Sequence, residues 1–164
     1  MNRLLNIRRD QRGVSSIELA LFAPILATMV IGVVDMSNAF SRKLECEQAA
    51  QRAIEKVMQT TGTKTPADTI IDEASLQADI PDAEKATKVT VTYRLECDDD
   101  DPQLSSDATT FDTYECPDTT VNEARYIQVE INDVYEPMFP LHFASYSSGD
   151  GGYPIKATAG MRTQ

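Results

Sequence analysis

The residue that most clearly indicates a chemical role is Glu18, which lies near the start of a long apolar run from Ile17 to Val34. A charged side chain at the centre of a membrane-spanning helix costs about 2.5 to 3.5 kcal/mol, and less near an interface, so an acid here indicates a function. In a low-dielectric surrounding this carboxylate can pair with an amine, because either charge alone would be buried without a partner. The alternative is that the Glu18 side chain only extends to the lipid headgroups.

Two thiols flank an acidic insertion in the second half of the chain. Cys97 ends a predicted strand, and Cys116 lies beyond the insertion. A disulfide between them fits an exported domain, and the loop-entropy model credits such a closure with about 3 kcal/mol. Reduced, separate cysteines are the alternative. Cys46 is left over, either as a buried thiol or as a partner for another subunit.

Four consecutive acids at the beginning of the insertion are a weak candidate for calcium binding. Carboxylates on a flexible loop can supply the oxygen ligands that calcium takes, but the spacing matches no EF-hand, and such charge runs are usually solvated. We therefore expect no required cofactor. The four candidate ligands are Asp98, Asp99, Asp100 and Asp101.

Other chemistry has little support in the sequence. His142 is the single histidine, and no cysteine pair has the spacing of a zinc site. The sequence has no Gly-x-Ser-x-Gly motif, no phosphate-binding glycine loop and no plausible Cys/His dyad, so we expect no enzyme. The formal net charge of −11 argues against nucleic-acid binding, which needs a basic surface.

The apolar run has about the length that a helix needs to cross a bilayer. Arginines precede it and Asp35 follows it, and this bias predicts a cytoplasmic N-terminus with everything after Asp35 outside. Pro24 removes one backbone hydrogen bond within the run, so we expect a kink that serves either as a simple bend or in assembly. A cleaved secretory signal is the alternative to a retained span. The preceding arginines are Arg3, Arg8, Arg9 and Arg12.

The residues after the span predict a head built from one helix face and a sheet. The helical pattern continues to about Thr60, and a second, short helix is expected from Pro66 to Ala78. Alternating apolar residues predict strands from Lys88, from Arg125 to Val134 and after Pro154. A long helix packed on a small antiparallel sheet is an α+β fold.

A basic leader, Gly13, four further residues, Glu18 and an apolar helix together resemble the prepilins that a membrane peptidase cuts. The segment Gly-Val-Ser-Ser-Ile-Glu-Leu-Ala-Leu-Phe-Ala-Pro-Ile-Leu is most similar to the TadE-like minor pilins of tight-adherence (Tad/Flp) pilus systems, and the closing segment from Ile155 to Arg162 resembles the end of such proteins. This resemblance implies a type IV pilin-like fold and cleavage between Gly13 and Val14, which would make Glu18 the fifth mature residue. The leader holds four Arg and one Asp, a net +3, so its removal from the total of −11 would leave −14.

The resemblance implies a structural function, that of a minor pilin-like protein that enters a Tad-type pilus through its N-terminal helix. In a filament, Glu18 would meet the freed amine of a neighbour's Val14 and set the register of the packed helices. The expected partners are other pilins and minor pilins, the prepilin peptidase and the inner-membrane pilus platform. We expect a single-pass protein of the inner membrane with a periplasmic or extracellular head, and a place in the pilus after assembly.

The domains expected on this basis follow the chain from leader to head. An uncleaved single-pass periplasmic binding or scaffold protein of the secretion or pilus machinery is the alternative, and a membrane-tethered enzyme of unrecognised type is a third class. The expected divisions are the leader at 1–13, the membrane and assembly helix at 14–35, its amphipathic continuation at 36–60, and the head at 61–164 with an acidic loop at 98–115.

Overall fold

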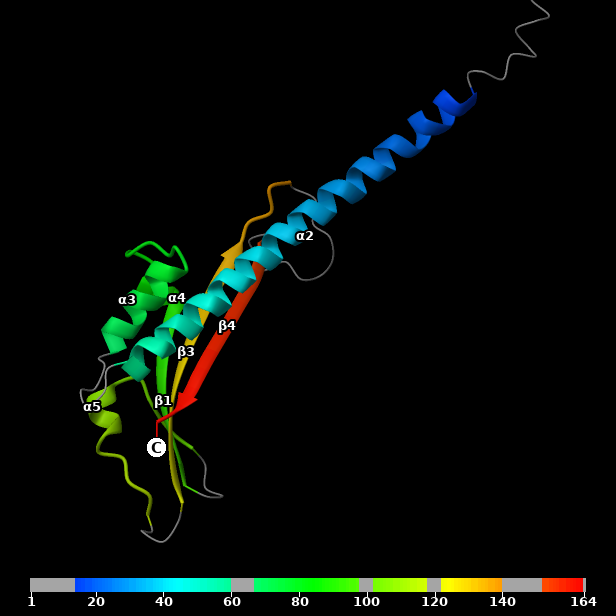
Figure 1. Ribbon diagram of the computed structural model, residues 1–164. Helices are drawn as coiled ribbons and strands as arrows, with labels where there is room; N and C mark the ends of the chain where they lie inside the picture. The colour runs from blue at the N-terminus through cyan, green and yellow to red at the C-terminus, as the bar shows by residue number, and fades with distance from the viewer. Residues whose placement is uncertain (1–13, 60–66, 98–101, 118–121, 140–151, 164) are drawn as a thin grey trace, which may run out of the picture.

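The computed structural model describes residues 14–59, 67–97, 102–117, 122–139 and 152–163. Its longest element is the helix α2 (Val14–Gln59), which has 46 residues and a length of about 69 Å at ~1.5 Å per residue. The C-terminal half of α2 lies along the sheet of the head, and the N-terminal half projects beyond the head (Figure 1).

The other elements form the head. They are the helices α3 (Ala67–Gln77), α4 (Lys85–Lys88) and α5 (Ala108–Phe111), and the strands β1 (Val89–Cys97), β2 (Gln103–Ser105), β3 (Glu123–Tyr135) and β4 (Tyr153–Arg162).

The strands form one antiparallel sheet in the order β2-β1-β3-β4. β1 pairs with β3 along its whole length, from Val89 opposite Ile131 to Cys97 opposite Glu123. β3 then pairs with β4 as far as Tyr135. β2 adds only a short edge beside β1.

The core lies between the sheet and the helices α2 and α3. Alternate residues of the three long strands are buried, as expected of a sheet with one face covered. The side of α2 that faces the sheet carries mostly small residues, which let the helix approach closely. The core-facing residues of this half of α2 are Cys46, Ala49, Ala50, Ala53 and Ile54.

The predicted α+β class is confirmed, and the elements agree closely with the pattern in the sequence. The helix expected to end near Thr60 ends at Gln59, and the short helix expected from Pro66 is α3. The insertion after Cys97 differs from a simple loop, because it contains β2 and α5. Asp107 caps α5 by accepting a hydrogen bond from the backbone amide of Thr109 at 2.9 Å.

Candidate functional site: the long helix and its junction with the head

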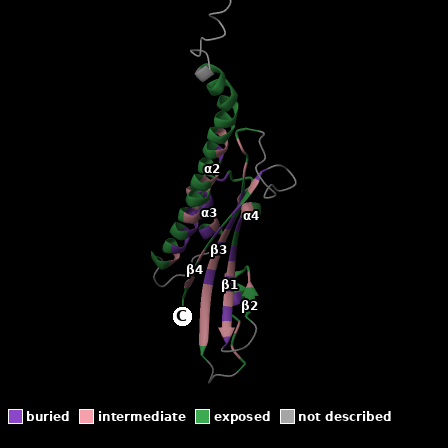
Figure 2. Ribbon diagram, turned by 90° about the vertical axis from the view of Figure 1, so that its right-hand side faces the viewer, coloured by how far each residue is buried: buried purple, intermediate pink, exposed green. Residues whose placement is uncertain are grey.

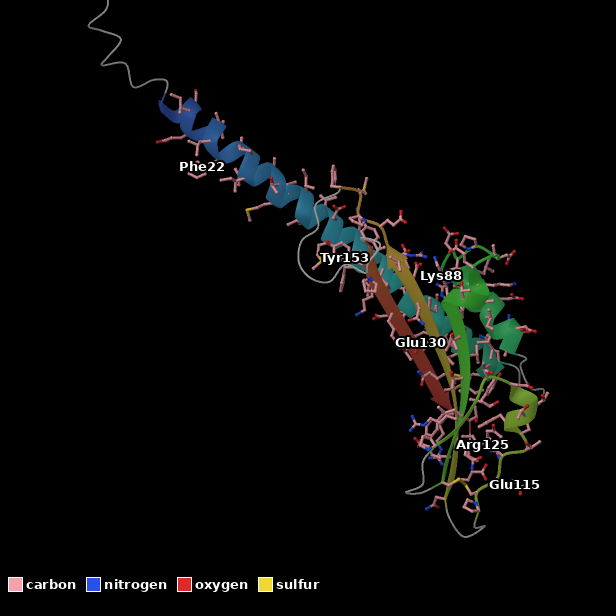
Figure 3. All side chains as sticks on the ribbon, turned by 180° about the vertical axis from the view of Figure 1, so that it is seen from behind. Phe22, Lys88, Glu115, Arg125, Glu130 and Tyr153 are labelled. Carbon is pink, nitrogen blue, oxygen red and sulfur yellow. A yellow bond between two sulfur atoms is a disulfide. The ribbon has the colours of Figure 1, made fainter. Side chains whose placement is uncertain are left out.

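The projecting half of α2 is apolar and exposed around its circumference. Figure 2 shows this half almost entirely in the colour of exposed residues, and Phe22 lies on it, well away from the head (Figure 3). By length and composition it is the one helix among the described residues that could cross a membrane. The exposed apolar side chains are Ile17, Leu19, Leu21, Phe22, Ile25, Leu26, Met29, Val30, Val33 and Val34.

The residues predicted for processing and register lie at the start of this helix. Val14 is the first residue of α2, and Glu18 is exposed one turn later. Gly13 lies outside the described residues. Within the part of the chain that the structure describes, Glu18 contacts no head element (Figure 1), so its pairing with a neighbour's amine stays a prediction.

Pro24 lies inside α2 without ending it. Four residues later, the hydroxyl of Thr28 donates a hydrogen bond to the carbonyl oxygen of Pro24 at 2.8 Å. This is the usual bond of a helical threonine to the carbonyl four residues earlier, and it does not involve the carbonyl of Ala20, which is the group that loses its helical donor at Pro24. The expected kink and any role in assembly remain predictions.

Asp35 has a role that the sequence did not indicate. It follows the apolar run, where an exposed acid would mark the membrane boundary, yet only 5% of it is exposed. One carboxylate oxygen accepts a hydrogen bond from the backbone amide of Met138, just beyond β3, at 3.1 Å. The side-chain amide of Asn38 donates to the sulfur of the same methionine at 3.6 Å. Asp35 therefore joins α2 to the head rather than facing solvent.

A second buried acid, Asp133 of β3, also joins α2 to the head, at Arg42, further along the helix than Asp35. Arg42 of α2 donates to one of its carboxylate oxygens from Nη2 at 2.7 Å and from Nε at 2.8 Å. Lys88, at the end of α4, donates to the other oxygen at 2.8 Å. The basic residues also contact exposed acids, since Arg42 pairs with Glu45 and Lys88 pairs with Glu84.

The charges of this cluster reinforce one another. Burial alone would raise the pKa of Asp133, but hydrogen bonds from Lys88 and Arg42 outweigh that effect and hold the pKa below its ordinary value. Burial would likewise lower the pKa of Arg42, and the bonds to Asp133 raise it instead. Arg42, Lys88 and Asp133 therefore stay ionised at neutral pH.

The free cysteine of the helix lies one turn beyond Arg42. Cys46 is fully buried against the sheet, and its burial raises the pKa of the thiol. Of the two alternatives for this residue, the structure contains the buried thiol. A bond to another subunit would require α2 to separate from the sheet.

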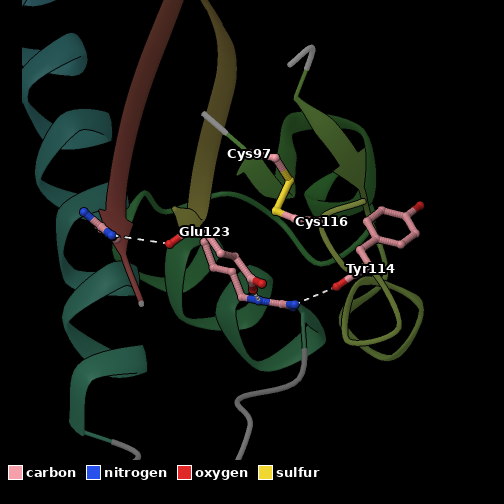
Figure 4. The surroundings of a disulfide bond; sticks show 6 residues. Cys97, Tyr114, Cys116 and Glu123 are labelled. Atoms are coloured by element: carbon pink, nitrogen blue, oxygen red, sulfur yellow. Dashed lines mark hydrogen bonds and ion pairs between the residues drawn. A yellow bond between two sulfur atoms is a disulfide. The ribbon is translucent and has the colours of Figure 1, made fainter. Parts of the chain in front are cut away.

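The predicted Cys97–Cys116 disulfide is present and ties the insertion to the end of β1. Arg125 of β3 reinforces this closure by donating to the carbonyl oxygen of Tyr114 at 2.6 Å and pairing with Glu123 (Figure 4). The guanidinium of Arg125 also lies over the ring of Phe111. The insertion is therefore held by covalent, polar and aromatic contacts at one end of the sheet.

The metal candidates receive no support from the part of the chain that the structure describes. Asp98, Asp99, Asp100 and Asp101 lie outside it, as does His142. Within it, no group of three or more His, Cys, Asp or Glu residues is arranged to hold a metal ion. Calcium binding by the acidic run stays an untested expectation.

One of three comparisons with known proteins finds a match, and that match lies on α2. Searches of curated proteins and of solved structures find no match. The model of the TadE-like protein family matches residues 13–54, which begin at Gly13, include Glu18 and Asp35, and end in the part of α2 that packs on the sheet. The resemblance seen in the sequence is therefore confirmed over this segment, which is consistent with a pilus-associated protein of the TadE-like family.

Proposed function

We propose that this chain is a minor pilin-like structural protein of a Tad-type pilus, processed by a prepilin peptidase between Gly13 and Val14. The observation that carries the proposal is the position of the family match, which starts at Gly13 and covers Glu18. Processing there would place Glu18 at the fifth position of the mature chain, at the start of the projecting half of α2, whose large apolar side chains from Ile17 to Val34 are mostly exposed in the monomer.

The architecture supports an assembly role through α2. A helix that projects about half its length from a folded head can insert its apolar half among other such helices, while the head stays in water. The projecting half would otherwise expose a large apolar surface, which soluble monomers avoid. Before assembly, the inner membrane covers that surface, with the N-terminus in the cytoplasm and the head outside.

The proposed partners follow from this role. The peptidase acts on the leader, the pilus platform inserts the processed chain, and other pilins pack against α2. In that packing, Glu18 of one chain and the amine of Val14 in the next offset each other in a low-dielectric surrounding, which fixes register more than it adds stability. We propose no enzymatic activity and no required cofactor.

The first test is the N-terminal sequence and intact mass of the full chain purified from membranes, with and without the candidate peptidase. We expect a start at Val14 only when the peptidase is present. Gly13→Leu should block the cut, because the bulky side chain replaces the small residue at the scissile bond. Ser16→Ala, three residues further along, is the matched control and should be processed normally.

The second test concerns Glu18 after processing. Glu18→Ala should lower the amount of this chain in sheared pili or pilus-assembly complexes, because the neighbour's amine would lose its counter-charge. Met29→Leu, an exposed change on the same helix that keeps it apolar, is the control. A start at Met1 in both strains, together with unchanged behaviour of Glu18→Ala, would favour the uncleaved single-pass binding or scaffold protein.

A further inference from the structure

The surface of α2 stays uncharged well beyond the end of the apolar run. Between Glu18 and Arg42 the only ionisable residue is Asp35, and the head covers it. The exposed surface from Leu19 to Ser41 is therefore free of charge over 23 residues, or about 34 Å of helix at ~1.5 Å per residue. That length exceeds the roughly 30 Å of a bilayer's hydrocarbon core by several ångströms.

Large apolar side chains occupy the extra length on the outer side of α2. Met36 is 72% exposed and Phe40 is 61% exposed. They follow Asp35 by one and five residues, which at roughly 100° per residue turns them about 100° and 140° away from it. Both therefore lie on the side of the helix away from the contact between Asp35 and the head.

The head supplies apolar side chains on the other side at the same level. Met138 is held beside Asp35 through its backbone amide, yet its side chain is 70% exposed, and Phe139 next to it is also exposed. Where α2 enters the head, apolar groups thus lie on both sides of the helix. A second helix would cover one side only, whereas a lipid layer surrounds its solute.

We propose that these four residues, Met36, Phe40, Met138 and Phe139, form a rim that lies in the interfacial layer of the membrane and seats the head on the lipid. The proposal rests on the proposed insertion of α2. Because Asp35 is buried and accepts a hydrogen bond from Met138, its charge does not prevent α2 from entering the lipid beyond this residue. The exposed Lys43 on α2 and Glu136 beyond β3 mark where the surface returns to water.

The position of the rim matches the dimensions of a bilayer. If the hydrocarbon core begins near Ile17, its far side is reached about 20 residues later, close to Met36. Phe40 then lies about 6 Å further out, within the headgroup region, where amphipathic and aromatic side chains are enriched. Tyr135 and Tyr153, which pair across β3 and β4, are at this end of the sheet (Figure 3).

Tryptophan fluorescence in lipid vesicles tests the rim directly, because the chain has no native tryptophan. Single variants Phe22→Trp, Phe40→Trp, Met138→Trp and Leu76→Trp are made in the full chain, each at an exposed site. They are reconstituted in phosphatidylcholine vesicles whose acyl chains carry bromine either near the headgroup or near the bilayer centre. Leu76, on α3 in the head, is the control for an exposed apolar residue in water.

The expected result is a depth profile. The fluorescence of Phe22→Trp should be quenched by bromines of the acyl chains, including those near the bilayer centre. The fluorescence of Phe40→Trp and Met138→Trp should be quenched most by the bromines near the headgroup. Both rim variants should show quenching several-fold above that of Leu76→Trp. The Met138 variant keeps the backbone amide that binds Asp35 and loses only the contact between Asn38 and the methionine sulfur.

The outcomes separate this inference from the proposed function. An unquenched Phe22→Trp would overturn the membrane span itself. A quenched Phe22→Trp with unquenched Phe40→Trp would overturn only the rim, and a blue shift of Phe40→Trp that depends on protein concentration would identify a second chain as its cover. Quenching of Phe40→Trp without that of Met138→Trp would also overturn the rim, because lipid must reach both sides.

Discussion

Replacing Asp133 by asparagine would test whether the buried acid of β3 holds the long helix on the head. The change keeps the size of the side chain but removes the charge that Arg42 and Lys88 share. Breaking a buried ion pair by loss of one partner costs about 3 to 5 kcal/mol. The side chains of Arg42 and Lys88 are 23% and 30% exposed and retain Glu45 and Glu84, so we expect a smaller loss of about 2 to 3 kcal/mol.

The assay is urea unfolding of the full chain in detergent micelles, followed by the fluorescence of its six tyrosines. Glu130→Gln is the matched control. Glu130 lies on the same strand and pairs with Lys156 at 2.8 Å, but on the solvent face of the sheet. Exposed pairs contribute about 0.2 to 1 kcal/mol, so the control should lose much less stability.

The pH dependence of the free energy of unfolding provides a second test of Asp133. Burial opposes ionisation of Asp133, but its bonds to Lys88 and Arg42 leave its pKa below the ordinary value in the folded state. Its contribution is therefore complete above the unfolded pKa of about 3.9 and is lost as the pH falls through the lowered folded value. The gap between wild type and Asp133→Asn should be largest at neutral pH and should narrow in acid. A loss no larger than that of Glu130→Gln at pH 7, or a gap independent of pH, would refute the reasoning.

Three further predictions concern the head and the half of α2 that packs on it. Replacing Cys97 and Cys116 together by serine should lower the free energy of unfolding by about 3 kcal/mol, because their separation of 19 residues sets the loop-closure entropy; wild type with reductant should behave alike in urea unfolding, and an unchanged midpoint would contradict the prediction. Cys46 should resist maleimide at neutral pH until urea is added, since it is fully buried and burial raises the pKa of its thiol; rapid labelling of the folded chain, measured by mass, would show that α2 leaves the sheet. Gly152→Ala should destabilise the head measurably in the same unfolding assay, because the added Cβ would lie so close to a methyl carbon of Val134 that atoms must shift. A variant as stable as wild type would mean that the Val134 side chain moves aside at no cost.

The elements of the fold could be predicted because their hydrophobic periods are clear. The alternation of Val89, Val91 and Leu95 identified β1 and its buried face, and the long helical pattern ended within a residue of its observed end. The disulfide was expected from the inferred export of the head and from the acidic insertion that Cys97 and Cys116 flank, and it is present. Local patterns of this kind are visible in one sequence because they depend on neighbours along the chain.

The junction could not be predicted, because its contacts are between residues far apart in the sequence. Asp35 and Met138 are 103 residues apart, and Arg42 and Asp133 are 91 apart. In the strand pattern, Asp133 occupies a position that faces the core, where an acid indicates an ion pair only once its partners are known. The apolar residues of 36–60 were also ambiguous. Ala39 faces the head and Phe40 faces away, and a helix with apolar residues on both sides does not reveal which side is covered.

The two buried acids together determine where the head sits along α2. Arg42 is the residue of α2 that reaches Asp133, and its two neighbours in the chain, Ser41 and Lys43, are exposed. A shift of the helix by one residue would turn Arg42 about 100° away from β3 and leave Asp133 buried with less than its full counter-charge. Asp35 would lose the amide of Met138 in the same movement. Because an unpaired buried carboxylate is costly, the junction holds α2 at one height, and the distance from Glu18 to the head is fixed by the head as well as by the helix.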